Sequence, residues 1–203
     1  MQGKLRMGGT LAAKHIKGSS GPGLPWRIQN YTRPVFLFGF VANAIAKGFS
    51  KLTGIPTLTA ELRAIKISAD GSQVNYGLLG CRVVTTAFVN EMVDQLQAED
   101  STWGDFKFHD SGVGTTAENV TDTDIETTDG ESRATGTQTE GAANIYESVG
   151  TISYTTTKAI TEHILANAST AGEAMDRTVF TAINVVNGDS IQFTYDLTVT
   201  AGS

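Results

Sequence analysis

The sequence predicts a mainly β protein, with a C-terminal antiparallel β-sandwich, one amphipathic helix and an extended N-terminal arm. Three observations lead to this fold class: the charge is divided by position, the prolines are confined to one end, and apolar residues alternate with polar ones near the other end. We expect a basic arm over residues 1–55, a strand-plus-helix connector over 56–98 and an acidic sandwich domain over 99–203.

The charge division separates the arm from the body. Residues 1–70 contain ten Lys or Arg and two acids, whereas residues 71–203 contain five basic and nineteen acidic residues. The formal net charge of the whole chain is −6. A basic segment favours an acidic partner, and an acidic body is repelled by nucleic acid. This pattern favours an assembly component, and we expect no direct binding of nucleic acid.

The arm is predicted to be irregular because all four prolines lie within the first 56 residues and Gly18–Gly23 is rich in Gly, Ser and Pro. Several aromatic residues follow it, and they need a surface that buries them, either on the same chain or on a neighbouring subunit. The residues expected to contact a partner are Trp26, Arg27, Tyr31, Arg33, Phe36, Phe38, Phe40, Lys47 and Lys51.

One stretch of this arm, Val35–Leu52, also shows helical spacing of its apolar residues, although Gly39 and Gly48 weaken that interpretation. Its run of about a dozen apolar residues is too short to span a bilayer. We expect it to be buried against a partner or the body. A helix at a membrane interface is the lesser alternative.

The connector is predicted to hold a strand within Thr57–Ile67, a turn at Asp70-Gly71 and a helix over Thr85–Gln97. A Thr hydroxyl can cap the start of this helix. An apolar stripe runs along it, and Glu91 is expected to face water with its polar neighbours. The stripe consists of Phe88, Val89, Met92, Val93 and Leu96.

Strands are predicted through the rest of the chain, with a long polar excursion over Asp110–Glu131. The clearest strand follows the turn signal Asn187-Gly188, and its inward-facing residues would alternate with polar ones. Several such strands separated by turns are typical of an antiparallel sandwich. The strand segments are Phe106–His109, Asn144–Tyr154, Ala159–Leu165, Arg177–Val186 and Ile191–Val199.

The histidines are the candidate residues for a catalytic triad. A triad needs a nucleophile, a base and an acid within reach of one another. In His109-Asp110 and Glu162-His163 the neighbours would point to opposite faces of a strand, so they cannot easily share a site. The lone Cys81 lies among apolar residues and is expected in the core. We expect hydrogen-bonded sheet histidines, no catalytic residue and no enzyme activity.

The acidic excursion contains Asp122, Asp124, Glu126 and Asp129. Such oxygen-rich loops can bind Ca²⁺, but the spacing lacks the glycine of an EF-hand loop. We expect a solvated loop with no metal and no cofactor. Pairing of these acids with the basic arm of a neighbouring copy is the alternative.

Several segments resemble structural proteins encoded by tailed bacteriophages, and similar sequence segments occur in fibre-like domains of phages. The resemblance covers roughly residues 75–203 and excludes the arm. The segments that carry it are Val83–Asn90, Phe106–Glu118, Arg133–Gln138, Ala159–His163, Asp176–Phe180 and Ile183–Tyr195.

The resemblance implies a virion component without enzyme activity. We therefore expect a capsid decoration, or cement, protein that is made in the host cytoplasm and sits on the capsid surface. Its expected partners are the major capsid protein, through the arm, and further copies of itself in a homo-oligomer, with no membrane contact. The alternative is a tail, neck or fibre component that binds a receptor or glycan, with Trp103, Tyr146 and Tyr154 as the candidate sugar contacts.

Overall fold

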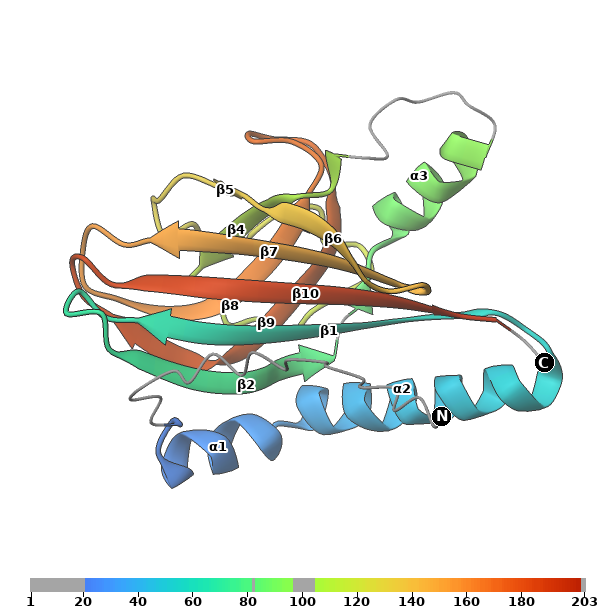
Figure 1. Cartoon of the computed structure of the whole chain (residues 1–203), viewed down its shortest axis with the longest axis horizontal. Coiled ribbons are helices and arrows are strands. Elements are labelled where there is room, and N and C mark those ends of the chain that lie inside the picture. Colours follow the sequence, from blue (N-terminus) through green and yellow to red (C-terminus); the bar gives the residue numbers. More distant parts are fainter. Residues whose placement is uncertain (1–20, 82, 97–104, 202–203) are drawn as a thin grey trace, which may run out of the picture.

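The computed structural model in Figure 1 describes residues 21–81, 83–96 and 105–201. In this part of the chain, two five-stranded antiparallel sheets pack face to face and three helices lie around them. The predicted class, a mainly β protein with an antiparallel sandwich, is confirmed.

The first sheet has the strand order β2-β1-β10-β7-β6 and the second has the order β3-β9-β8-β4-β5. The strands of the first sheet are β2 (Gln73–Cys81), β1 (Thr57–Ile67), β10 (Ser190–Thr200), β7 (Ile145–Ser153) and β6 (Thr137–Ala142). Those of the second are β3 (Val83–Val84), β9 (Ala174–Val185), β8 (Lys158–Ala166), β4 (Phe108–Gly112) and β5 (Ala134–Thr135).

At each edge of the sandwich, the edge strand of one sheet is followed directly in the chain by the edge strand of the other sheet. On one side β2 ends at Cys81 in the first sheet and β3 starts at Val83 in the second. On the other side β5 and β6 meet at Gly136, where a Cβ atom would lie 2.7 Å from His109 Nε2. The crossing at Gly136 therefore requires a residue without a side chain, because the chain passes directly over the His109 ring.

The main core lies between the sheets. Ile191, Phe193, Tyr195 and Leu197 of β10 are buried, as their alternation predicts, and they pack in one core with buried residues of the neighbouring strand β1 and of β9 in the other sheet. The second sheet is also covered on its other face, where Ile164, Ala166 and Ala174 pack against Phe108 and Ile125. Ile125 belongs to the long excursion between β4 and β5, so this loop closes a second, smaller core.

The predicted connector is not a separate unit. β1 pairs with β10 along its whole length, from Thr57 opposite Thr200 to Ile67 opposite Ser190. Its hairpin partner β2 follows a turn in which Gly71 has a φ of 81°, as the Asp-Gly signal predicts. The sheet therefore begins at Thr57, and the expected division at residue 99 is wrong because β1 pairs with β10 and β2 pairs with β1 in the same sheet.

The predicted helix is present as α3 (Thr86–Leu96), and Thr85 caps it by accepting a hydrogen bond from the Phe88 backbone N–H. Phe88 is buried, but the outer residues of its apolar stripe are exposed. Glu91 is buried instead of facing water, so that part of the prediction is wrong.

The extended arm is wrong for residues 24–53, which form α1 (Leu24–Tyr31) and α2 (Pro34–Thr53). Two of the four prolines that indicated irregular chain, Pro25 and Pro34, lie in the first turn of a helix, where a fixed φ and a missing N–H are tolerated. α2 ends at Gly54, whose φ is 73°. Residues 1–20 of the predicted arm lie outside the described part of the chain.

Candidate docking surface

α1 is held to the sandwich by two side chains. Trp26 donates from Nε1 to the carbonyl oxygens of Thr181 and Ala182 at 3.1 Å each and packs edge-on against Tyr76. Asn30 is fully buried; its Nδ2 donates to Leu79 O at 2.9 Å, and its Oδ1 accepts from Thr181 N at 3.0 Å. Because Leu79 belongs to β2 and Thr181 to β9, Asn30 joins the two sheets at their edge.

α2 turns its small and polar residues toward the sandwich. Gly39 lies against β2, where a Cβ atom would come within 2.8 Å of the Cys81 carbonyl oxygen. Asn43 Nδ2 donates to Ala60 O at 3.2 Å, Lys47 Nζ lies 3.5 Å from Glu61 Oε1, and Ser50 Oγ donates to Thr200 O at 3.2 Å. The helix runs along β1 and β2 (Figure 1) on contacts that involve few large apolar side chains.

The opposite face of α2 is apolar and open to solvent. Phe38 is 78% exposed and Leu52 is 86% exposed, and the residues between them follow the same helical stripe. A whole Phe side chain has roughly 200 Å² of surface, so the two phenylalanines of this face, Phe38 and Phe49, expose on the order of 250 Å². We call this face the α2 surface; it consists of Leu37, Phe38, Val41, Ile45, Phe49 and Leu52. Phe40 is also exposed, but it lies two residues from Phe38 and so points to a different side of the helix.

A groove of about 390 Å³ runs along one flank of the α2 surface, between the helix and Thr57 at the start of β1. Its walls are almost entirely apolar. Its lining residues are Phe38, Val41, Ala42, Ile45, Ala46, Phe49 and Thr57.

The segment that bears the α2 surface carries cations and no acid of its own. Residues 21–54 include Arg27, Arg33, Lys47 and Lys51 and no Asp or Glu. Burial lowers the pKa of Arg33, an effect that Glu118 opposes. The segment thus combines an apolar face with positive charge.

The nine predicted partner residues differ in whether they contact the rest of the chain or remain exposed. Trp26 is held by β9, and the Tyr31 and Phe36 rings pack on each other with centroids 5.0 Å apart. Phe38 lies on the face away from the sandwich, and Phe40 lies on another side of the helix; both are exposed and remain open to a partner. Arg27 and Arg33 belong to α1 and the turn after it, and Lys47 pairs with Glu61. Lys51 lies in α2, and its side chain is outside the described part.

Five residues of the α2 surface were not among the predicted partner contacts. The helical spacing of Val41, Ile45 and Phe49 with Phe38 was the signal that identifies three of them. Leu37 lies one turn before Val41, and Leu52 extends the stripe by one turn beyond Phe49.

The histidines of the sandwich lie in its interior. His109 Nδ1 is 3.0 Å from His163 Nε2, and His109 Nε2 is 2.9 Å from Ser148 Oγ. Neither ring has any solvent exposure. Their neighbours Asp110 and Glu162 point to the other face of the second sheet, where they meet Arg133 and Arg177. The prediction of hydrogen-bonded sheet histidines is confirmed.

The carboxylates of the acidic excursion are occupied by arginines of the same chain. Arg177 contacts Asp122 at 3.0 Å and Glu126 at 3.1 Å, and Arg133 contacts Asp124 at 2.7 Å. The alternative that these acids also pair with a neighbouring arm stays a prediction. Across the residues with described coordinates, no group of three or more His, Cys, Asp or Glu is placed to hold a metal ion.

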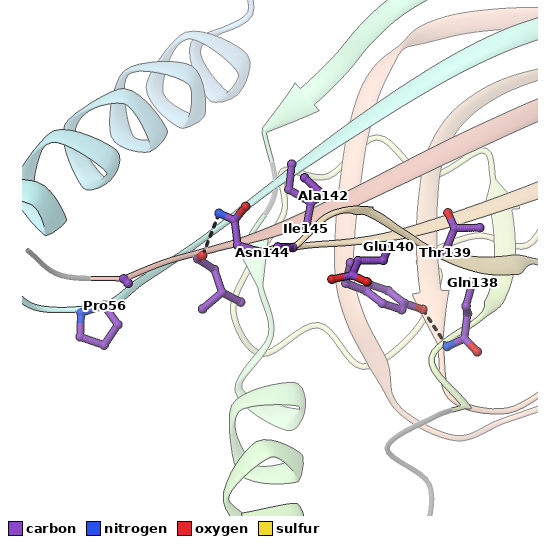
Figure 2. Close-up of a pocket in the computed structure, with 11 residues that line it drawn as sticks. Pro56, Gln138, Thr139, Glu140, Ala142, Asn144 and Ile145 are labelled. Carbon is purple, nitrogen blue, oxygen red and sulfur yellow. Dashed lines mark hydrogen bonds between the residues drawn. The ribbon is translucent and has the colours of Figure 1, made fainter. Parts of the chain in front are cut away.

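A second concavity, of about 730 Å³, lies at the end of the sandwich beside the β6–β7 hairpin (Figure 2). We call it the hairpin hollow. Two hydrogen bonds brace it: Asn144 Nδ2 donates to Val199 O at 3.1 Å, and Gln138 Nε2 donates to Tyr146 Oη at 2.9 Å. It is lined by Pro56, Gln138, Thr139, Glu140, Ala142, Ala143, Asn144, Ile145, Tyr146, Val199 and Ala201.

Comparison of the chain with protein-family models, with curated proteins and with solved structures found no match. Within the described residues no helix, α2 included, is long and apolar enough to cross a membrane.

Proposed function

We propose that this chain is a structural subunit of a virus particle, a capsid decoration protein whose copies join one another through the α2 surface. The observation that carries the proposal is the exposed apolar face of α2, a helix that turns its small and polar residues to its own sandwich.

The size of the α2 surface supports a protein neighbour. Contiguous apolar patches beyond a few hundred Å² are uncommon on soluble monomers and mark interaction sites. Stable interfaces bury about 800 Å² per partner, and their centres are enriched in aromatic side chains. Phe38 and Phe49 supply such a centre, and the flanking aliphatic residues extend it.

Charge supports another copy of the chain as that neighbour. The segment that bears α2 contains four cations and no acid, whereas residues 71–203 carry nineteen acids against five basic residues. A basic apolar surface and an acidic body in one chain are complementary between copies, which speeds and orients their encounter. Many weak contacts of this kind would add up on a particle with many copies.

The virion setting is supported by the resemblance of residues 75–203 to structural proteins of tailed phages. The major capsid protein is proposed as the second partner. Its contact through the basic opening residues stays a prediction, because residues 1–20 lie outside the described part of the chain.

Labelling and counting on purified particles test this proposal. Immunogold labelling combined with quantitative mass spectrometry should place hundreds of copies on the head. The Ile45→Asp variant, whose side chain lies at the centre of the α2 surface, should be incorporated at least tenfold less than wild type. Leu96→Asp, which changes an exposed leucine on α3, should be incorporated normally.

Six or twelve copies at the tail or neck would contradict the decoration role and favour the tail or fibre alternative. No sugar contact currently supports that alternative among the described residues, since Tyr154 is buried and the Tyr146 hydroxyl donates to Phe106 O. Trp103 lies outside the described part of the chain.

A further inference from the structure

We infer that the α2 surface of one copy packs into the hairpin hollow of a second copy. This inference rests on the proposed function, since it specifies which surface of the neighbouring copy covers α2. It makes the contact a pairing of two different surfaces instead of a pairing of α2 with itself.

The lining of the hollow combines small side chains with the larger Ile145, Tyr146 and Val199. Ala142 and Ala143 at the hairpin tip are exposed, and Ala201 and Pro56 complete the apolar wall opposite them. The α2 surface presents the reverse shape, because its large side chains project from a helix that holds them in line. Protruding aromatic anchors that enter hollows are the usual centre of a stable interface.

The rims of the two surfaces are also complementary. Glu140 lies on the rim of the hollow, and none of its lining residues is Lys or Arg. The segment that bears the α2 surface, residues 21–54, carries four cations and no carboxylate, and one of the four, Lys47, contacts Glu61 of β1. An acid on the receiving side thus meets cations on the entering side, which favours this orientation of two copies.

The same charges disfavour the symmetric contact. Two α2 surfaces packed on each other would bring together two segments that each carry four cations and no acid, and Glu61 of β1 offsets the charge of one of the four, Lys47. Like charges across an interface cost free energy, so the helix is better matched by the hollow than by its own copy.

The hollow is rigid enough to receive a helix. Asn144 and Val199 are joined by two hydrogen bonds, Asn144 Nδ2 to Val199 O at 3.1 Å and Val199 N to Asn144 O at 2.9 Å. Gln138 and Tyr146 are joined by a third. Figure 2 shows these pairs on either side of the labelled hairpin residues. A preformed site costs less ordering entropy on binding.

A mixing experiment with two variants of the full chain tests the inference. Ile45→Asp places a charge on α2, and Ala143→Trp fills the hollow. Each variant alone should lose self-association by at least tenfold in affinity, whereas an equimolar mixture should form a complex with one copy of each, because one undamaged α2 surface and one undamaged hollow remain. Sedimentation velocity and native mass spectrometry measure the species.

Matched controls are Leu96→Asp on α3 and Ser169→Trp in the β8–β9 loop, both at exposed positions, which should associate as the wild type does. Phe38→Ser and Ala142→Phe provide a second pair of variants if either of the first pair fails to fold. Circular dichroism checks folding.

An Ala143→Trp variant that self-associates like wild type would overturn the inference. So would a mixture that stays monomeric, a wild type that is monomeric at all concentrations, or anionic vesicles that bind wild type and not Ile45→Asp. Particle labelling is independent of these results, so the failure of the pairing and the failure of the virion role can be told apart.

Discussion

Glu162 is a carboxylate without solvent exposure, and it organises the loop that covers the second sheet. Oε1 accepts hydrogen bonds from the backbone N–H groups of Gly114 at 2.8 Å and Thr127 at 2.9 Å. Oε2 accepts from Glu126 N at 3.0 Å and from Arg177 Nε at 2.8 Å. A buried charge is tolerated only with such a set of partners, and this one ties both ends of the excursion to β8.

We predict that Glu162→Gln destabilises the fold by about 3 kcal/mol, because it leaves the buried Arg177 without its closest countercharge and turns an amide N–H₂ toward donors. Urea unfolding measures the change. Glu140→Gln, at an exposed carboxylate, should change stability by less than about 0.5 kcal/mol. Equal effects of the two substitutions would contradict the account of the loop.

Glu131 gives the fold a pH dependence. Hydrogen bonds from Lys158, then from Thr155, hold the pKa of Glu131 below its ordinary value of 4.5. The ionised carboxylate therefore stabilises the fold fully above about pH 4.5, and this stabilisation is lost as the pH falls through the lower pKa of the folded state. We expect the stability difference between wild type and Glu131→Gln to be constant from pH 6 to pH 8 and to shrink below pH 4.5. Urea titrations across this range measure it. A difference that grows in acid would contradict this sign.

Alanine substitutions at two glycines of α2 are expected to change the stability of the fold in opposite directions. At Gly39 a Cβ atom would lie 2.8 Å from the Cys81 carbonyl oxygen, whereas at Gly48 it would meet nothing within 4 Å. Gly48→Ala should raise stability by about 0.5–1 kcal/mol through helix propensity. Gly39→Ala should lower it, because the helix must move away from β2. Thermal unfolding of dilute protein measures both. If Gly39→Ala were also stabilising, α2 would not lie against β2.

The elements themselves were largely predictable from short-range patterns. The alternation in β10, the Asp70-Gly71 turn and the Thr85 cap report local chemistry, and each appears in the structure. Asn187-Gly188 indicated a turn, and Gly188 has a φ of 89°. That turn nevertheless joins β9 of one sheet to β10 of the other, since pairing partners are chosen by the whole core.

The orientation of α2 could not be predicted from its sequence. A stripe with Phe38, Val41 and Ile45 normally faces the core, and the periodicity alone fits either orientation. The contacts of Gly39, Asn43 and Ser50 with β1, β2 and β10 decide it, and these depend on strands that are distant in sequence. The prolines led to the incorrect prediction of an extended arm for a similar reason, because proline is common both in the first turn of a helix and in irregular chain.

In the whole molecule, the division of charge along the sequence corresponds to different structural elements. The basic segment that was expected to be an arm forms α1 and α2, and Trp26 and Asn30 attach it to the sandwich. Its apolar side is exposed to solvent. The excess of acids lies in the remainder of the chain. Copies of such a molecule attract each other in one orientation, which is the property that an assembly subunit needs.

The central claim is that the α2 surface is a contact between protein copies. Sedimentation velocity over a concentration series tests it most directly, with Leu52→Asp and Leu96→Asp as a matched pair, since these leucines are 86% and 87% exposed on different helices. We predict that wild type and Leu96→Asp self-associate and that Leu52→Asp shifts toward the monomer by about tenfold in dissociation constant, or about 1.4 kcal/mol. Identical sedimentation of all three proteins would contradict the claim.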